Sequence, residues 1–140
     1  MHAMMCYRTP QSFKLRFNRT INKELNIYNV ESWLLYHGNK LKERFQLQAY
    51  KAMNHLLGKI DISRNGKSFE ENIQKIQSEI HIISIDSDLF FPLSEDCETV
   101  ALAEKANVNI HHHIISSDFG HDAFLMEHKK VKEILTTILN

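Results

Sequence analysis

Two stretches of the chain combine carboxylate and imidazole side chains at a spacing that suits nucleophilic catalysis. The first is an apolar run, Ile82 to Ile85, that is followed by Asp86 and Asp88. The second is Gly120-His121-Asp122, which follows another apolar run. A carboxylate that orients a histidine and a histidine that moves protons are two of the three members of a Ser-His-Asp triad. The sequence thus predicts the acid and the base of a triad, with the acid first in the chain.

Asp88 is the predicted acid and His121 the predicted base. Asp88 lies past the end of the first strand, and the apolar residues after it would fix the loop by packing. His121 follows the second strand, where Gly120 permits a tight turn. Taken singly, Asp86 and Asp88 could cap a turn before the next helix, and His121 could lie in a surface loop. Their joint occurrence, with a helix between the two strands, favours catalysis.

Asp122 and a run of three histidines are weaker candidates. Asp122 would contact an amine-bearing substrate or cap the segment before Ala123, and taken alone the residue favours the second role. His111-His112-His113 cannot all share one face of a strand, because successive side chains point to opposite sides. No carboxylate or cysteine stands at ligand spacing in the sequence, so we expect a polar strand end and no metal site.

Composition narrows the classes of partner. The net charge is zero and the pI is near 7.1, so neither nucleic acid nor an acidic membrane surface is an expected partner. Cys6 and Cys97 lie far apart, which favours reduced thiols over a disulfide framework or a zinc site. No stretch approaches the ~20 apolar residues of a membrane helix, and the cytoplasm is the expected location.

Residues 1–64 are predicted to be helical. We expect helices at the N-terminus, from Pro10 after a Thr9 cap, from Val30 to an end at Gly38, and over residues 46–57. Residues 20–29 are expected to form a loop. Helical spacing predicts the buried side of the fourth helix as Leu47, Tyr50, Met53 (or Ala52) and Leu57.

Residues 68–140 are predicted to alternate helices with strands. A Ser68 capping box opens a helix, and strands are expected at Ile80–Ile85 and Val108–Ile115. A helix capped by Ser94 would run to about Ala106 between them, and His128–Leu139 would form the last helix. Such alternation predicts parallel pairing and an α/β fold. Because two strands make no stable sheet covered on both faces, we expect extensive dimerisation or, preferably, the C-terminal part of a larger protein.

Six cationic residues of the first half admit two interpretations. They would meet a phosphate-bearing cofactor such as coenzyme A, or form a solvated helical face. The second is favoured, because acids are interspersed and no glycine-rich cradle is present. The residues are Arg8, Arg16, Arg19, Lys40, Lys42 and Arg44.

Several segments of the chain resemble the homoserine O-acetyltransferase family. They occur in the family's order and span essentially the whole chain. Tyr36 to Lys40 departs from the usual Gln-Gly-Asp-Lys at His37 and Asn39. The segments are Ala3 to Pro10, Val30 to Lys40, Arg44 to Tyr50, Ile85 to Pro92 and Phe119 to Leu125.

The resemblance implies the C-terminal part of an α/β-hydrolase fold, with residues 1–64 as a helical lid and residues 65–140 as the core segment. It implies transfer of acetyl from acetyl-CoA to the hydroxyl of L-homoserine, in methionine biosynthesis, through a serine acyl-enzyme. Asp88 and His121 would be the triad acid and base, and Asp122 would bind the amino group of homoserine. Acetyl-CoA would be a substrate, and no bound cofactor is expected.

The nucleophile is absent from these 140 residues, because no Gly-x-Ser-x-Gly occurs in them. The family's elbow, oxyanion strand and substrate-binding Arg would all precede Ala3. We therefore expect the chain alone to be inactive, and an N-terminal half or a second copy to be its partner. The alternatives are a non-catalytic remnant or split subunit that docks on an N-terminal partner, and a related serine O-acyltransferase or esterase.

Overall fold

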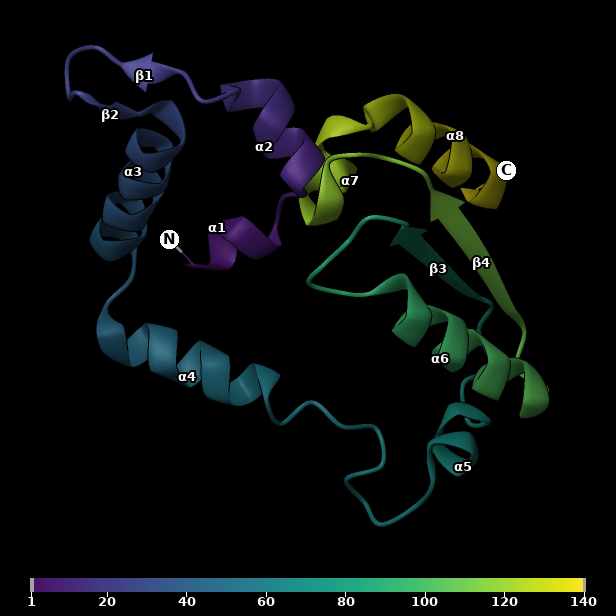
Figure 1. Ribbon diagram of the computed structural model, residues 1–140. Coiled ribbons are helices and arrows are strands. Elements are labelled where there is room, and N and C mark those ends of the chain that lie inside the picture. Colours follow the sequence, from purple (N-terminus) through teal and green to yellow (C-terminus); the bar gives the residue numbers. More distant parts are fainter. Residues whose placement is uncertain (1, 140) are drawn as a thin grey trace.

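The computed structural model describes residues 2–139 (Figure 1). Its second half is built on two parallel strands, β3 (Ile80–Ile85) and β4 (Ile110–Ile115), joined by α6 (Leu93–Lys105). Ile80 pairs with Ile110, and the register continues to Ile85 with Ile115. The predicted parallel pairing is confirmed, although β4 begins later than the predicted Val108. Parallel pairing brings the C-terminal ends of both strands to one edge.

Helices cover both faces of the strand pair. On one face α7 (Ala123–Met126) and α8 (His128–Leu139) pack Ala123, Val131 and Ile134 against Ile85 and Ile115. On the other face α5 (Phe69–Ile73) and α6 pack against the beginning of the strands through Ile73, Ala103 and Ala106. The predicted capping box of α5 is present, since the Ser68 hydroxyl accepts from Glu71 N–H and the Glu71 carboxylate accepts from Ser68 N–H. The result is a mixed α/β structure with two small apolar clusters.

The first half is mainly helical. It contains α1 (His2–Cys6), α2 (Pro10–Phe17), α3 (Asn29–Arg44) and α4 (Leu47–Leu57). The predicted cap of α2 is present, because the Thr9 hydroxyl oxygen accepts from Ser12 N–H at 3.0 Å. Figure 1 shows α1 and α2 between the strand pair and α3, with α3 and α4 farthest from the strands.

Two predictions for this half are wrong. Residues 20–29 contain a short antiparallel pair, β1 (Ile21–Asn22) and β2 (Ile27–Tyr28), instead of a plain loop. The turn between them forms because Asn22 Oδ1 accepts from two backbone N–H groups and Asn26 adopts φ 52°, which asparagine tolerates. Gly38 does not end α3, which continues to Arg44. One interior glycine costs only about 1 kcal/mol relative to alanine, and helix formers follow it.

Two predicted details of packing and capping are also wrong. The apolar side of α4 is exposed, with Leu47 69% and Met53 55% accessible. Periodicity shows which side of a helix is apolar, but not whether another element covers it. Helix α6 begins at Leu93 after Pro92, so Ser94 lies within its first turn and is not its cap.

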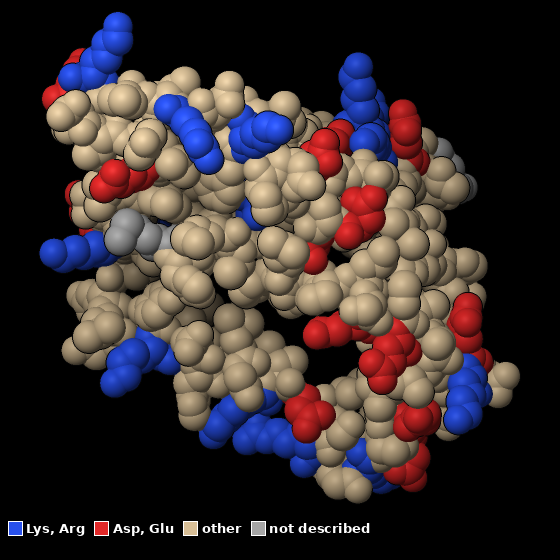
Figure 2. All heavy atoms as spheres, viewed as in Figure 1, with Lys and Arg blue, Asp and Glu red and all other residues tan. Residues whose placement is uncertain are grey.

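The charged side chains are unevenly distributed over the surface. In the view of Figure 2, the charged side chains over α4 are Lys and Arg, and Asp and Glu side chains lie around α6, at the upper right and at the upper left. Within residues 2–139, no helix is both long and apolar enough to cross a membrane.

Candidate active site

Asp88 and His121 meet beyond the C-terminal ends of β3 and β4. Asp88 follows β3 in a turn that its own N–H closes on Ile85 O at 3.2 Å, and His121 lies in the 3-10 turn Gly120–Asp122. The distance from His121 Nδ1 to Asp88 Oδ2 is 2.8 Å. The Asp88 side chain is 7% exposed and that of His121 is 22% exposed. The two residues that the sequence singles out as acid and base therefore form one hydrogen-bonded pair.

Both oxygens of Asp88 are engaged. Oδ1 accepts from Phe90 N–H at 2.7 Å and from Phe91 N–H at 3.0 Å, which leaves Oδ2 for the imidazole. A carboxylate held in this way is a fixed acceptor for Nδ1–H. It selects the tautomer in which His121 Nε2 carries a lone pair, and a general base needs that lone pair.

Aromatic rings surround His121. The ring centroids of Tyr7, Phe90 and Phe91 lie 5.2, 5.2 and 5.3 Å from the imidazole centroid, and Phe124 lies at 5.8 Å. A cavity of about 330 Å³ adjoins the pair, lined by Asp88, His121, Phe91, Phe124 and residues of β3. Within residues 2–139 no hydrogen bond engages Nε2. The site can thus move a proton at Nε2 in a largely apolar surrounding.

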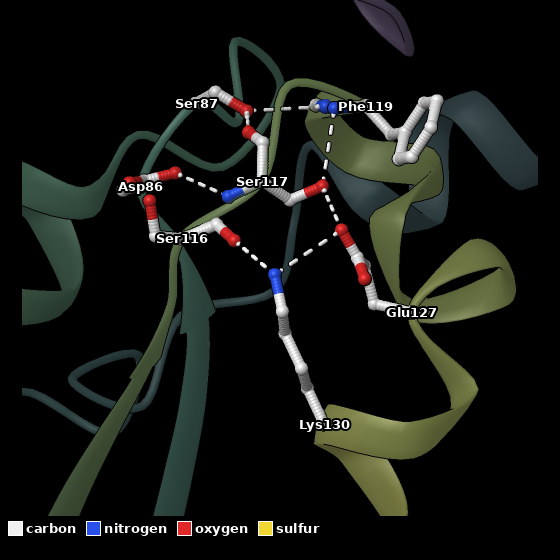
Figure 3. A network of polar contacts seen from close by, with 8 residues as sticks. Asp86, Ser87, Ser116, Ser117, Phe119, Glu127 and Lys130 are labelled. Atoms are coloured by element: carbon white, nitrogen blue, oxygen red, sulfur yellow. Dashed lines mark hydrogen bonds and ion pairs between the residues drawn. The ribbon is translucent and has the colours of Figure 1, made fainter.

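Asp86 serves a different purpose from Asp88. Its Oδ1 accepts from Ser117 N–H at 3.0 Å, just past the end of β4 (Figure 3). The Ser116 hydroxyl and then the Ser117 N–H lower the pKa of Asp86 below its ordinary value of 3.8. Asp86 thus binds the end of one strand to the other and does not contact His121.

The same network continues to α8. The Ser117 hydroxyl donates to Glu127 at 2.9 Å, and this contact lowers the pKa of Glu127. Lys130 donates to Ser116 O at 2.7 Å and to Glu127 at 3.3 Å (Figure 3). These contacts anchor the segment after β4 on the helix that follows the site.

Ser87 is a site-supporting residue that sequence reasoning missed. Its hydroxyl donates to Ser117 O and accepts from Gly120 N–H at 3.1 Å, next to His121 (Figure 3). The only sequence signal was its place between two aspartates. Through Ser87 the loop of Asp88 holds the loop of His121.

Asp122 is paired with Arg8. Arg8 Nε donates to Asp122 Oδ2 at 2.8 Å, and the two side chains are 12% and 17% exposed. The predicted solvated helical face is therefore wrong for Arg8, which lies between α1 and α2. The Asp122 side chain does not cap α7. The predicted alternative of a capping role is thus wrong, and Asp122 Oδ1 carries no hydrogen bond within residues 2–139.

The first half of the chain docks directly on the histidine loop. Asp122 N–H donates to Tyr7 O at 3.1 Å, and the Thr9 hydroxyl donates to Asp118 O. Gly120 adopts φ 64°, and a Cβ there would lie 3.2 Å from Tyr7 O. Gly120 is thus required both by its backbone angle and by the close approach of Tyr7.

The histidine run is divided between the two faces of β4. His111 Nε2 lies 2.7 Å from Glu79 Oε1, and His113 Nε2 lies 3.1 Å from His81 Nδ1. On the other face His112 Nε2 lies 2.7 Å from Ser84 Oγ. The folded chain thus brings one carboxylate, that of Glu79, beside the run. In the part of the chain that the structure describes, no group of three or more ligands could hold a metal ion.

Comparison with known proteins identifies relatives that are named homoserine O-acetyltransferase. A homoserine O-acetyltransferase of Chlorobium chlorochromatii is 31% identical over 142 residues, which is 100% of this chain and 39% of the relative. That of Chloroherpeton thalassium is 36% identical over 135 residues, 96% of this chain and 34% of the relative. That of Symbiobacterium thermophilum is 33% identical over 147 residues, 99% of this chain and 38% of the relative. No family model matches the chain.

These matches run along the whole chain but leave most of each relative unmatched. The chain spans between about a third and two fifths of the length of the curated relatives. The resemblance seen in the short motifs therefore extends over the entire sequence, and the chain belongs, as a partial-length member, to the homoserine O-acetyltransferase family.

Proposed function

We propose that this chain supplies the acid and the base of a serine acyltransferase that moves acetyl from acetyl-CoA to the hydroxyl of L-homoserine. In this proposal the activity belongs to methionine biosynthesis in the cytoplasm. The nucleophilic serine lies outside these 140 residues, because no Gly-x-Ser-x-Gly occurs in them. The support is membership of the family together with the geometry of the Asp88–His121 pair.

His121 acts as general base in each half of the reaction. Its Nε2 takes the proton of the serine as the serine attacks the thioester, and returns it to the departing thiolate. It then takes the proton of the homoserine hydroxyl, which attacks the acyl-enzyme, and returns that proton to the serine. Asp88 orients the ring and stabilises the imidazolium through Nδ1–H. Exclusion of water from the acyl-enzyme would favour transfer over hydrolysis.

Asp122 is the proposed contact for the amino group of homoserine. Arg8 holds one carboxylate oxygen, which fixes the direction of the other. The free oxygen, Oδ1, would accept from the ammonium group. Asp122 follows His121 directly in the chain, so an acceptor bound there lies near the base.

One observation carries the proposal: the 2.8 Å contact between His121 Nδ1 and Asp88 Oδ2, with Nε2 left for a reacting group. The Asp88 side chain is 7% exposed, and its second oxygen accepts from two backbone N–H groups. A fixed pair of this kind costs conformational entropy, and a catalytic role accounts for it.

A second candidate function is docking without catalysis. Within residues 2–139, β3 and β4 each have one hydrogen-bonded neighbour and therefore one free edge. Helix α4 also exposes large apolar side chains, Leu47, Tyr50, Met53, Leu56 and Leu57. Unpaired edges and exposed apolar residues favour binding to an N-terminal partner or to a second copy, whether or not the complex is active.

The test is a thiol-release assay with acetyl-CoA and homoserine. The chain is assayed alone and after coexpression with the portion of the Chloroherpeton thalassium relative that the match leaves uncovered. We expect no turnover by the chain alone and turnover by the pair, reduced about 10⁴-fold in His121→Gln and in Asp88→Asn. The exposed His128→Gln is the matched control and retains activity.

The outcomes separate the two candidates. Turnover by the chain alone would refute the need for a second segment, and full activity of His121→Gln would refute the assigned base. A stable complex on gel filtration that releases no thiol would support docking without catalysis.

A further inference from the structure

A small cavity in the first half of the chain is lined in part by cations and shares Tyr7 with the surroundings of the Asp88–His121 pair. It has a volume of about 230 Å³ and lies between α1, α3 and α4. Helix α3 contributes three basic side chains to it at helical spacing. The lining residues are Ala3, Met4 and Tyr7, then His37, Lys40, Leu41 and Arg44, and finally Tyr50 of α4.

The basic side chains of this cavity lack acidic partners. The lining contains no Asp or Glu, and α4 contains none at all. Within residues 2–139, no carboxylate lies within 4 Å of the charged nitrogens of His37, Lys40 or Arg44. Lys40 Nζ donates only to the Tyr36 hydroxyl, at 3.0 Å. Cationic donors gathered at a concave surface are the usual means of binding a small anion.

Further cations face His37 from the neighbouring elements. Partial burial is the main reason that the pKa of His37 is lowered, and Lys40 on α3, Arg16 on α2 and Arg8 lower it further. Asp122 is the single acid that acts in the opposite direction, and Arg8 already neutralises it. The surroundings of His37 therefore carry an excess of positive charge that an added anion would relieve.

We propose that this cavity binds a phosphate group, with Arg44 and Lys40 as its charged donors and His37 as a donor that gains its proton when the anion enters. Arg44 supplies a planar fork that matches two phosphate oxygens, and Lys40 supplies a point charge. Tyr7 and Tyr50 also line the cavity. A carboxylate has two oxygens for these donors and one negative charge. A phosphate monoester has three oxygens and close to two charges, and it fits the donor set better.

Sulfate is the first probe, because it is tetrahedral and stays a dianion across the pH range in which histidine titrates. With ¹³C-labelled histidine, sulfate should shift the His37 ring resonance in a saturable manner and raise the pKa of His37. The affinity for sulfate should therefore be higher at pH 5.5 than at pH 8. This dependence on pH should disappear in His37→Gln.

Variants on α3 identify the donors. We expect Lys40→Gln combined with Arg44→Gln to weaken sulfate binding at least about tenfold, since hydrogen bonds to charged groups are lost. Lys42→Gln is the matched control, because Lys42 lies on the same helix outside the cavity. Far-UV circular dichroism should remain unchanged, because Lys40 and Arg44 are exposed. An equal loss in Lys42→Gln, or no shift of His37 with sulfate, would overturn the proposal.

A second arm determines the source of the phosphate. Adenosine 3′,5′-bisphosphate carries the phosphates of an adenosine-type acyl donor, and adenosine is its uncharged control. If the bisphosphate saturates the shift of the His37 resonance at a lower concentration than inorganic phosphate does, the cavity binds the phosphates of an adenosine-type acyl donor. Equal concentrations would assign it to free phosphate. Binding of adenosine as tight as that of the bisphosphate would refute a phosphate site, and none of these outcomes depends on acyl transfer.

Discussion

The two halves of the chain differ in what they bury. Every buried hydrophobic side chain among residues 2–139 lies after residue 72, and all except Val100 belong to the clusters on the two faces of β3 and β4. The buried residues of the first half are two polar ones, Thr9 and Ser12. Their contacts fasten the start of α2 and join it to the loop of His121. Apolar burial thus builds the second half, and polar contacts at the site attach the first.

The difference suggests how stability and function are divided. The second half has its own core and holds the acid–base pair in place. The first half is mainly helical, yet its apolar side chains are largely exposed. The exposed fraction is 79% for Ile60 and 69% for Leu47. Such a region gains stability from something that covers it. The exposed apolar side chains of the first half are therefore one place where a partner would add stability.

The largest expected effect concerns the core of the second half. Ile115→Ala removes a side chain that is 2% exposed and should reduce the free energy of unfolding by about 3 kcal/mol. Met53→Ala on α4 is the matched change in the first half and should alter it by less than about 0.5 kcal/mol. Urea denaturation measures both. A comparable loss for Met53→Ala would mean that α4 is covered in solution, and would remove the contrast between the halves.

The contact between the halves is tested at Gly120. Gly120→Ala places an L-residue at φ 64° and a Cβ at 3.2 Å from Tyr7 O. We expect a loss of about 2 kcal/mol in the free energy of unfolding, from the backbone angle and the close approach together. Gly66→Ala is the matched control, because Gly66 has φ 79° and nothing within 4 Å of the added Cβ, and about 1 kcal/mol is expected. Equal losses would show that the approach of Tyr7 contributes nothing.

The cap of α2 gives a smaller effect. Thr9→Ala removes the acceptor of Ser12 N–H and the donor to Asp118 O, and should cost about 1.5 kcal/mol. Ser68→Ala removes the cap of α5 alone and should cost about 1 kcal/mol. In addition, Thr9→Ala should shift the NMR resonances of the His121 loop, and Ser68→Ala should leave them in place. If these resonances do not shift in Thr9→Ala, the contact between Thr9 and Asp118 O does not influence the His121 loop.

The smallest effect is the pH dependence of the network in Figure 3. The folded state lowers the pKa of Asp86 and of Glu127 below their ordinary values of 3.8 and 4.5. The folded state therefore favours the carboxylate forms, and unfolding takes up protons. Their contribution is complete above these ordinary values and declines as the pH falls through the lowered ones. Asp86→Asn should flatten the fall in thermal midpoint over this range. Glu133→Gln, on α8, should not change it, and an unchanged slope in Asp86→Asn would contradict the role of the network.

Prediction from sequence worked best where a local rule sufficed. The bounds of β3, the cap at Thr9 and the capping box at Ser68 follow from neighbouring residues. Prediction was less accurate where two rules competed. Glycine often ends a helix, but helix-forming residues follow Gly38, and α3 continues to Arg44. Of the candidate site, the meeting of Asp88 and His121 was predicted, because parallel strands bring their C-terminal ends together. The contacts of Ser87 with Gly120 and of Arg8 with Asp122 were not predicted.

The sequence by itself determined the alternation of helices and strands after residue 68, the candidate acid and base residues and the family, because these depend on residue type, spacing and similarity along the chain. Only the tertiary structure decided which partner each polar group takes. Asp88 is hydrogen-bonded to His121, Asp86 to Ser117, and Asp122 to Arg8. These partners lie 33, 31 and 114 residues apart in the chain. No local pattern encodes such choices, since they depend on how the packing of strands and helices directs each side chain.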